Sequence, residues 1–261
     1  MKAIILAAGK GSRLYPVTLN KPKGLLKIGN ETILDRLIRQ FRDLGINDIL
    51  LVVGFKKEIF KDHFGDEVRY REYGNFDNTN NLHTLWSIND ELNNDVIISF
   101  ADLVLHDEVI YKLIQSPGEI VMAVDTSQVL KNTMRVEVDN DRLLSIKTTT
   151  IKNSSGNFIG LAKFNSKGCK RLLSGMKKII NGNYDDYYTL AIDNMSRSGK
   201  MVNYCDINGI LWREIDTKYE YDEVLKISHL FNNDKKIEKG ELWKKYIYQW
   251  VQRLCTMVTL I

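Results

Sequence analysis

The sequence contains little cysteine and no long apolar run. Its three cysteines, Cys169, Cys205 and Cys255, are an odd number without metal-ligand spacing, so we expect reduced thiols in a cytoplasmic protein rather than a disulfide framework. No stretch reaches the roughly 18 consecutive apolar residues of a membrane-spanning helix. The apolar run at residues 3–8 is also too short for the core of a signal peptide. The sequence therefore predicts a cytoplasmic protein that acts on soluble molecules.

The charges and the polar residues exclude further classes. The 261 residues include 37 Lys and Arg and 33 Asp and Glu, which gives a formal net charge of +4. That excess is too small to indicate a nucleic-acid-binding protein, because such a protein needs a concentrated basic face. The four histidines have no ligand spacing, and no Ser-His-Asp or Cys-His arrangement is evident. With 44% hydrophobic and 27% charged residues, the composition is that of a soluble globular protein.

Short apolar runs alternate with helical patterns in the first hundred residues. Continuous apolar runs that end near glycine or aspartate are typical of strands buried on both faces of a parallel sheet. Strands separated by amphipathic helices with short connections predict an α/β fold. The runs predict strands at 2–7, 48–53, 68–72 and 95–100, and the helical patterns predict helices at 32–44 and 80–92.

The middle of the chain is rich in predicted strands. Apolar runs with Gly and Asn between them indicate short strands over about residues 117–165, and we expect this section to extend the sheet or to form a lid. Helical patterns then return before two last strands. The predicted strands lie at 119–124, 135–138, 143–146, 158–164, 201–206 and 210–215, and the helices at 167–180 and 187–198.

The last 30 residues differ in composition from the rest. Apolar pairs with helical spacing from Leu242 to Val258 predict an amphipathic helix. We therefore expect one domain over 1–231 and a C-terminal helical extension over 232–261. The helix would pack on its own domain or join two copies of the chain; a helix at a membrane surface or between domains is the alternative, since basic residues flank its aromatics.

A glycine-containing loop follows the first predicted strand. Gly9 and Gly11 would let the backbone approach an anionic group, and successive N–H groups can hold phosphate oxygens. The loop is neither of two common phosphate-binding loops, because no Gly-Lys-Ser/Thr follows it and Leu14 occupies the place of a third glycine. Arg13 and Lys23 lie close by in the sequence, so we expect both side chains to converge on a polyphosphate.

This loop and its surroundings resemble the signature of the sugar-phosphate nucleotidylyltransferase superfamily. The resemblance implies a Rossmann-like three-layer α/β/α fold with a mostly parallel central sheet and a small strand-rich substrate lid. It covers about residues 1–230, and its motifs are residues 6–14 (Leu-Ala-Ala-Gly-Lys-Gly-Ser-Arg-Leu), 21–23 (Lys-Pro-Lys), 99–102 (Ser-Phe-Ala-Asp) and 214–217 (Glu-Ile-Asp-Thr).

Residues 80–86 (Asn-Asn-Leu-His-Thr-Leu-Trp), 96–102 and 158–164 resemble the branch of phosphocholine and 2-aminoethylphosphonate cytidylyltransferases. This implies transfer of CMP from CTP to a small phosphorylated or phosphonate acceptor with release of pyrophosphate, for decorating a cell-surface glycan or lipid. The attacking oxygen is already anionic near neutral pH, so no general base is required. Arg13 and Lys23 would be the catalytic residues, because they hold the triphosphate and stabilise the charge of the leaving group.

Two aspartates that are distant in sequence are candidate metal ligands. Asp102 and Asp216 each follow a predicted strand, and ligands of open α/β sheets bind at the carboxyl ends of strands. Taken alone, each Asp would be interpreted as a turn or helix-cap residue, but the resemblance assigns both positions to the metal. Mg²⁺ prefers oxygen ligands. We therefore expect Mg²⁺ as the cofactor, held by Asp102 and Asp216.

The resemblance places the nucleotide along the glycine loop and the helix expected at 80–92. Asn80 and Asn81 could read the base, because an amide both donates to and accepts from a pyrimidine edge. Asn80 could instead only cap the helix. The residues themselves do not separate CTP from UTP. The predicted nucleotide-binding residues are Leu6, Ala7, Ala8, Gly9, Gly11, Ser12, Asn80, Asn81 and Thr84.

The expected acceptor is phosphocholine or a small phosphonate such as 2-aminoethylphosphonate. A cationic head group needs aromatic faces or carboxylates. Arg135 and Lys147 could bind the anionic end, and a surface position is an equal alternative for both. Core packing is the alternative for each aromatic residue. The predicted acceptor-binding residues are Arg135, Lys147, Asp186, Tyr187 and Trp212.

Two other functions remain open from the sequence. One is a hexose-1-phosphate nucleotidylyltransferase that uses UTP or dTTP; the short substrate section and the Asn80-Asn81 pair argue against it. The other is a catalytically silent relative that serves as a binding subunit. The presence of all six of Gly9, Gly11, Arg13, Lys23, Asp102 and Asp216 argues against that alternative.

Overall fold

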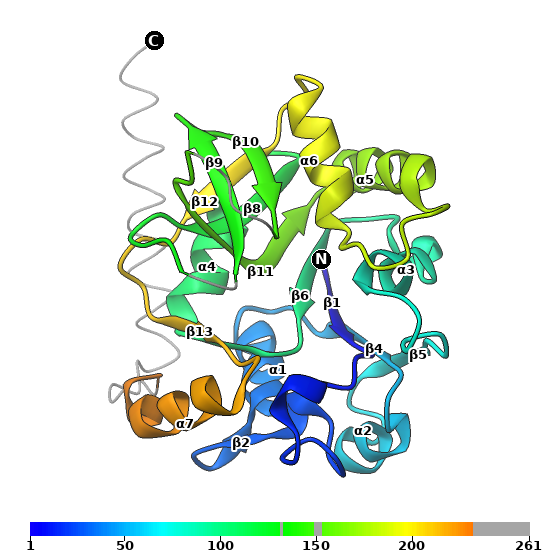
Figure 1. Ribbon diagram of the computed structural model, residues 1–261, viewed down its shortest axis with the longest axis vertical. Helices are drawn as coiled ribbons and strands as arrows, with labels where there is room; N and C mark the ends of the chain where they lie inside the picture. Colours follow the sequence, from blue (N-terminus) through cyan, green and yellow to red (C-terminus); the bar gives the residue numbers. More distant parts are fainter. Residues whose placement is uncertain (131–132, 149–152, 232–261) are drawn as a thin grey trace.

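A nine-stranded sheet forms the centre of the molecule (Figure 1). The computed structural model describes residues 1–130, 133–148 and 153–231, and the element counts here refer to these residues. In spatial order the strands are β5 (Arg69–Glu72), β4 (Asp48–Val53), β1 (Lys2–Ala7), β6 (Val96–Phe100), β11 (Gly156–Phe164), β8 (Ile120–Asp125), β12 (Asn203–Asp206), β10 (Arg142–Lys147) and β9 (Met134–Asp139).

The first half of the sheet is parallel, as the alternation of strands and helices predicts. β1 lies between β4 and β6, with Ile5 opposite both Leu51 and Ser99, and β5 continues the parallel order beyond β4. A parallel neighbour requires a crossover, and helices in this part of the chain supply it. The carboxyl ends of β1 and β6 therefore meet at one edge.

The second half of the sheet is mixed, so the prediction of a mostly parallel sheet is wrong there. β11 runs antiparallel to both β6 and β8, and β9 and β10 form an antiparallel hairpin. Residues 140–141 alone connect β9 to β10, and so short a connection cannot return the chain in the same direction. In addition β9 pairs with β11, which closes this half of the sheet on itself.

The strands within residues 117–165 extend the central sheet. β8 and β11 lie in the interior of the strand order, and all residues of β8 are buried. Only β9 and β10 lie toward the far edge of the sheet. Of the two expectations for this section, the sheet extension is observed, and the strands form close to their predicted places.

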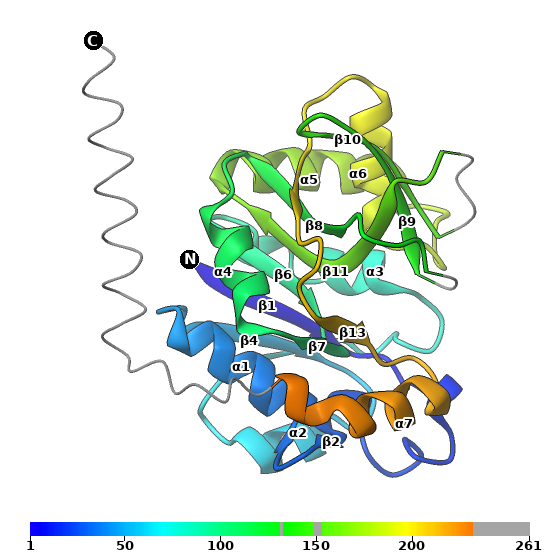
Figure 2. The ribbon, with the colours of Figure 1, turned by 90° about the vertical axis from the view of Figure 1, so that its left-hand side faces the viewer.

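Helices cover both faces of the sheet. Alternate residues of β1 pack into different clusters: Ile5 contacts the side with α1 (Ile33–Asp43), whereas Ile4 contacts the opposite side. Figure 2 shows α1 beside α4 on one side of the sheet. The first side also carries α2 (Lys57–Phe64) and α4 (Asp107–Gln115), and the second carries α3 (Asn81–Trp86), α5 (Ser166–Ile179) and α6 (Thr189–Arg197).

Three helices were not predicted, namely α2, α4 and α7 (Lys218–Ile227). α2 buries two side chains, α4 buries three and α7 buries Val224 alone, so their sequence periodicity is weak. The helix expected at 80–92 is also shorter, because α3 ends at Trp86. The remaining short strands are β2 (Lys27–Ile28), β3 (Glu31–Thr32), β7 (Leu103–Leu105) and β13 (Trp212–Glu214).

The cysteine and membrane predictions can be compared with the described part of the chain. Cys169 and Cys205 are free and buried, which agrees with reduced thiols. Among the described helices, none has both the length and the apolar character needed to cross a bilayer. Cys255 and the amphipathic helix predicted within 232–261 lie outside the described residues.

Candidate active site

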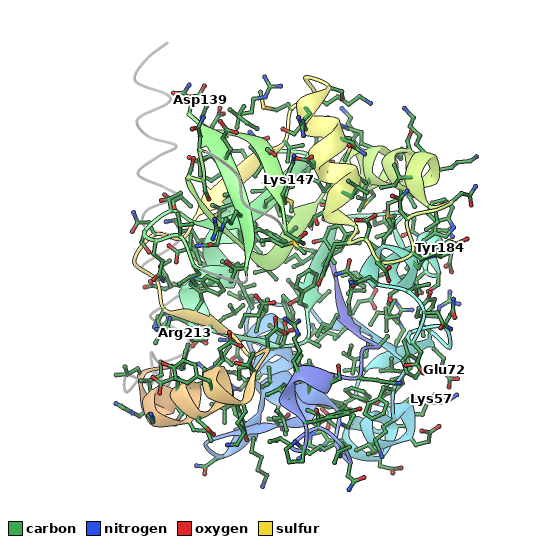
Figure 3. The ribbon with its side chains drawn as sticks, viewed as in Figure 1. Lys57, Glu72, Asp139, Lys147, Tyr184 and Arg213 are labelled. Carbon is green, nitrogen blue, oxygen red and sulfur yellow. The ribbon has the colours of Figure 1, made fainter. Side chains whose placement is uncertain are left out.

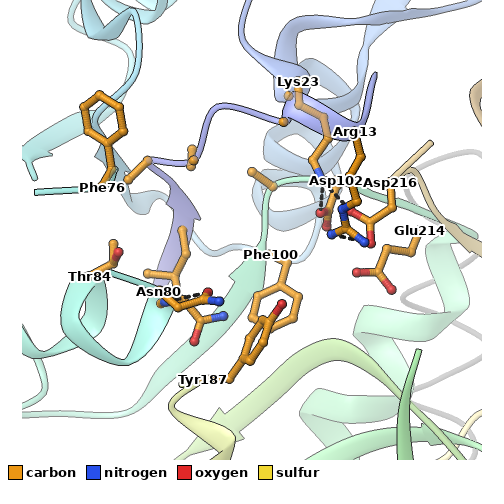
Figure 4. Close-up of a pocket in the computed structure, with 18 of the residues that line it drawn as sticks. Arg13, Lys23, Phe76, Asn80, Thr84, Phe100, Asp102, Tyr187, Glu214 and Asp216 are labelled. Atoms are coloured by element: carbon orange, nitrogen blue, oxygen red, sulfur yellow. Dashed lines mark hydrogen bonds and ion pairs between the residues drawn. The ribbon is translucent and has the colours of Figure 1, made fainter. Parts of the chain in front are cut away.

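A cleft of about 370 Å³ opens where β1 and β6 end (Figure 4). This is the position at which open α/β sheets bind ligands. The loop after β1, the start of α3 and the residues after β6 and β13 all contribute to it. Every predicted nucleotide-binding residue lines this cleft, together with Arg13, Lys23, Asp102, Tyr187 and Asp216.

The glycine loop requires its second glycine. Gly11 has φ +62° and ψ +37°, a left-handed conformation that side chains disfavour. A Cβ at Gly11 would also lie 3.2 Å from Cβ of Lys23. The hydroxyl of Thr18 donates to the Gly11 carbonyl over 2.8 Å, which fixes the turn. The loop therefore packs directly against the stem of Lys23, whereas a Cβ at Gly9 would meet no atom within 4 Å.

Lys23 and Arg13 converge on the two predicted metal ligands. Lys23 Nζ lies 2.5 Å from Asp102 Oδ2 and 2.8 Å from Asp216 Oδ1. Arg13 Nη2 lies 3.0 Å from Asp216 Oδ2, and the Arg13 side chain is 60% exposed to the cleft and solvent. Gly24 allows this approach, because a Cβ there would lie 3.1 Å from the carbonyl oxygen of Ala101. The basic side chains and the carboxylates thus face one another across one corner of the cleft.

The pairing of two short strands brings the acidic residues together. β13 pairs antiparallel with β7, so that Glu214 lies opposite Leu103, and the Ile215 amide donates to the Asp102 carbonyl over 3.0 Å. Asp216 follows at once. Ligand oxygens of Asp102, Glu214 and Asp216 all lie within 4.8 Å of one another.

Glu214 is a site residue that sequence reasoning missed. Its signal was present, because residues two apart on an extended segment point to the same side, and Glu214 precedes Asp216 by two. The side chain is largely buried and lines the cleft. Figure 4 shows it beside Asp216, on the side away from Lys23.

The electrostatics of this corner reflect an excess of negative charge. Burial opposes the charge on Lys23, but the attraction of Asp102 and Asp216 outweighs burial and raises the pKa of the ammonium group. Burial raises the pKa of the Asp102 carboxyl, and Lys23 lowers it only in part. Burial and the neighbouring Asp102 and Asp216 raise the pKa of Glu214 well above its ordinary value. Another cation would relieve this repulsion.

These residues fit a divalent cation. Oδ1 of Asp102 is buried without a hydrogen-bond partner, although its other oxygen binds Lys23. A buried carboxylate oxygen left unpaired is costly. Three carboxylates close together provide the oxygen donors that Mg²⁺ prefers. Asp102, Glu214 and Asp216 are therefore the residues that could hold the metal.

The asparagine pair lies at the opposite end of the cleft from the carboxylates. Asn80 is the N-cap of α3, and its Oδ1 accepts from the Asn81 amide over 2.8 Å. Oδ1 of Asn81 accepts from the Tyr188 amide over 2.9 Å. Both side chains line the cleft, as does Thr84. The capping alternative for Asn80 is observed, and its Nδ2 donates to the Asp185 carbonyl.

Aromatic side chains form the wall between these two ends. Phe100, at the end of β6, contacts Phe158 and Tyr187 with ring centroids 6.1 and 6.5 Å apart. All three line the cleft. Gly160, at φ +86°, makes room for Phe100, because a Cβ there would lie 2.6 Å from the ring. Sequence reasoning missed Phe100 and Phe158, since a buried strand gives no sign of which aromatic ring reaches a cleft.

Four predicted acceptor-binding residues do not line the cleft. Trp212 is 2% exposed, and its Nε1 donates to Asp125 over 2.8 Å, so the indole belongs to the core and its prediction is corrected. Arg135 lies opposite Lys147 in the β9–β10 hairpin, where Figure 3 labels Lys147. Asp186 contributes its carbonyl oxygen to the amide of Leu82. Only Tyr187 of that set reaches the cleft.

Comparison with known proteins gives consistent matches. A model of the nucleotidyl transferase family matches residues 2–168. The CTP:phosphoglutamine cytidylyltransferase of Campylobacter jejuni is 28% identical over 243 residues, which cover 83% of this chain and 96% of that protein. The choline-phosphate cytidylyltransferase of Streptococcus pneumoniae is 27% identical over 237 residues, which cover 87% and 99%. These matches confirm the resemblance that the motifs indicate.

Solved structures match over most of the chain as well. The CTP:phosphocholine cytidylyltransferase from Streptococcus pneumoniae has a TM-score of 0.74 at 23% identity, covering 87% of this chain and 98% of that one. The inositol-1-phosphate CTP transferase from T. maritima has a TM-score of 0.75 at 19% identity, covering 89% and 96%. At these identities the likeness establishes the fold.

Proposed function

Because this chain belongs to the nucleotidyl transferase family, we propose that it transfers CMP from CTP to a small phosphorylated or phosphonate acceptor and releases pyrophosphate. Relatives named as cytidylyltransferases for phosphoglutamine and choline phosphate, each covered nearly end to end, support CTP as the donor. The proposal also takes Mg²⁺ as the cofactor.

The observation that carries the proposal is the position of Lys23 and Arg13. Both side chains lie between the glycine loop and the carboxylate cluster of Asp102, Glu214 and Asp216. A triphosphate bound along the loop would place its phosphorus atoms next to cationic groups that are already held in position. Such preorganised charge is usually the largest contribution to catalysis of a transfer that creates negative charge.

The chemistry requires alignment more than proton transfer. An anionic oxygen of the acceptor attacks the α-phosphorus of CTP, the bond to the β-phosphate breaks, and pyrophosphate leaves with the bonding electrons. Lys23 and Arg13 stabilise the charge on the phosphate oxygens, and the cleft holds the two substrates in line. A divalent cation at the carboxylates would supply Lewis-acid neutralisation of the phosphate charge.

The aromatic wall supports an acceptor with a compact organic group. Phe100, Phe158 and Tyr187 offer apolar ring faces, and Glu214 offers a carboxylate at one end of that wall. A cationic head group such as choline or an aminoethyl group would be stabilised there by the ring faces. Phosphocholine and 2-aminoethylphosphonate are therefore the first acceptors to test.

Pyrophosphate release with each of CTP, UTP, ATP and dTTP, in the presence of Mg²⁺, tests the proposal. The acceptor panel should contain phosphocholine, 2-aminoethylphosphonate, phosphoglutamine, inositol 1-phosphate and glucose 1-phosphate. We expect turnover with CTP and an acceptor other than the hexose phosphate, and none in the Asp102→Asn variant. Turnover only with UTP or dTTP and glucose 1-phosphate would replace the proposal by a hexose-1-phosphate nucleotidylyltransferase. Nucleotide binding without turnover under any combination would indicate a silent binding subunit.

A further inference from the structure

The start of α3 is joined to the segment at 184–188 by a ladder of polar contacts. The Asn80 amide donates to the Tyr184 carbonyl over 2.7 Å, and the Leu82 amide donates to the Asp186 carbonyl over 3.2 Å. Between them, Oδ1 of Asn81 accepts from the Tyr188 amide over 2.9 Å, across 107 positions in the sequence. Figure 3 shows Tyr184 beside α3, where its ring stacks on His83.

The same segment carries one face of the aromatic wall. Tyr188 is fully buried and packs edge-on against Phe100, with ring centroids 6.2 Å apart. Tyr187, its neighbour, lines the cleft and also packs near Phe100, with ring centroids 6.5 Å apart. Figure 4 shows Tyr187 and Phe100 together between Asn80 and the carboxylates. The place of the Tyr187 ring thus depends on how the backbone at 187–188 is held.

Asn81 is the side chain that holds this backbone. The cap of α3 is Asn80, so Asn81 does not fill the local capping role, and its oxygen serves the distant segment instead. Asn81 lines the cleft, and among the hydrogen bonds of the described residues none uses its Nδ2. Oδ1 of Asn81 therefore holds the backbone at Tyr188, whereas Nδ2 is not needed for that contact.

We propose that Asn81 is a positioning residue for acceptor binding, because its Oδ1 holds the Tyr188 amide and so sets the Tyr187 ring in the wall that the acceptor contacts. This inference rests on the proposed function, in which Tyr187 contacts the acceptor. It separates the role of Asn81 from base recognition, which would use Nδ2. A change at the nucleotide end of the cleft can thus alter the acceptor end.

Two substitutions separate the two ends of the amide. Asn81→Asp keeps an oxygen that accepts from the Tyr188 amide and removes Nδ2, whereas Asn81→Leu removes both groups at similar size. We expect Asn81→Leu to raise the KM for the acceptor about 3- to 10-fold, as for the loss of one hydrogen bond, with Asn81→Asp well below that. The added charge of Asp repels both anionic substrates and raises both KM values, so the KM for CTP is measured in parallel and the acceptor KM of Asn81→Asp is judged relative to it. Asn89→Leu, at an exposed amide after the far end of α3, is the matched control.

Hydrogen exchange supplies a readout that does not depend on turnover. The Tyr188 amide should keep its protection in wild type and Asn81→Asp and lose it in Asn81→Leu, measured on peptides that span 184–188. Asn81→Ala serves as a second variant if Asn81→Leu does not fold. If the wild type has no activity with any acceptor, the proposed function fails, while the exchange data still test the Asn81–Tyr188 contact.

A double-mutant cycle with Tyr187→Ala decides whether Asn81 acts through Tyr187. We expect Tyr187→Ala to raise the acceptor KM, and Asn81→Leu to add less than 2-fold in that background, because coupled residues are not additive. An Asn81→Leu effect that persists in full in the Tyr187→Ala background would overturn the inference. An effect of Asn81→Leu on the KM for CTP alone would also overturn it and leave base recognition as the role of Asn81.

Discussion

The ammonium nitrogen of Lys23 lies 2.5 Å from Oδ2 of Asp102 and joins residues 79 positions apart. The same nitrogen lies 2.8 Å from Oδ1 of Asp216, so the ammonium group of Lys23 lies between the two predicted metal ligands. Its aliphatic stem is held by the left-handed turn at Gly11. The glycine loop and the acidic cluster are thus parts of one packed unit, and a substitution in either should alter the geometry of the other.

Removal of the Lys23 charge should lower turnover sharply. In Lys23→Met, we expect kcat to fall by about 10²–10³-fold, the loss typical of one preorganised charged donor. The variant should also be less stable, since three carboxylates would remain with less compensation. Steady-state kinetics and urea unfolding check the two effects. Lys21→Met, in the same Lys-Pro-Lys motif but without an ion pair among the described residues, should keep most of the activity.

Each carboxylate of the cluster should contribute to metal binding. We expect Asp102→Asn and Asp216→Asn to abolish turnover and to weaken Mn²⁺ binding at least tenfold, and Glu214→Gln to weaken it less. The reason is that Asp102 has an unpaired buried oxygen, whereas burial raises the pKa of Glu214 and disfavours its charge. Direct titration with Mn²⁺, followed by electron paramagnetic resonance without substrates, measures the affinity. Unchanged affinity in both aspartate variants would remove the metal assignment.

The two glycines of the loop should respond differently to alanine. Gly11→Ala should reduce stability by about 1–2 kcal/mol, because the residue is left-handed and the new Cβ would press on the Lys23 stem. Gly9→Ala should leave stability unchanged, since its Cβ would meet no protein atom, but should weaken CTP binding if phosphates approach that backbone. Thermal unfolding and calorimetric titration with CTP distinguish the two outcomes. Equal loss of stability in both variants would contradict this account of the turn.

Low pH should weaken the ion pairs that Glu91 forms with Lys2 and Arg69. Hydrogen bonds from Arg69, and then from Lys2, lower the pKa of Glu91 from 4.5 to about 2. They outweigh burial, which by itself would raise this pKa. A depressed folded-state pKa means that the stabilisation is complete above pH 4.5 and is lost as the pH falls toward 2. We expect Glu91→Gln to be less stable than wild type at pH 7 by about 1–3 kcal/mol. That difference should shrink at pH 3.

The matched control for this pH effect is an exposed carboxylate. Glu72 lies beside Lys57 at the surface (Figure 3) and pairs with both Lys57 and Lys61. Its pKa is likewise lowered to about 2, first by the hydrogen bond from Lys57. Solvent screens such pairs, so Glu72→Gln should show a much smaller pH-dependent loss. Urea unfolding at pH 7, 5 and 3 compares the three proteins. A constant difference between wild type and Glu91→Gln at all three values would rule out the proposed role of Glu91.

Local sequence patterns predicted most elements of the parallel half of the fold. β1 and β4 have the predicted bounds, because a run of apolar residues that ends at glycine identifies a buried strand without reference to its partners. The glycine loop and Lys23 follow from local signals of the same kind, whereas Asp102 was assigned to the site by the resemblance to a known family. α7 escaped prediction, since a helix that buries only Val224 leaves little periodicity.

The sequence by itself therefore determined the family, the strand–helix alternation, and Arg13, Lys23, Asp102 and Asp216 as candidate site residues. Only the tertiary structure decided that β11 runs antiparallel, that Glu214 joins Asp102 and Asp216, and that Trp212 packs in the core. The physical reason is that the conformation and the burial pattern of a short segment depend mainly on the residues within that segment. Which distant segments pair, and which side chain then reaches the cleft, depends on contacts such as that between Ile215 and Asp102, which local sequence patterns do not encode.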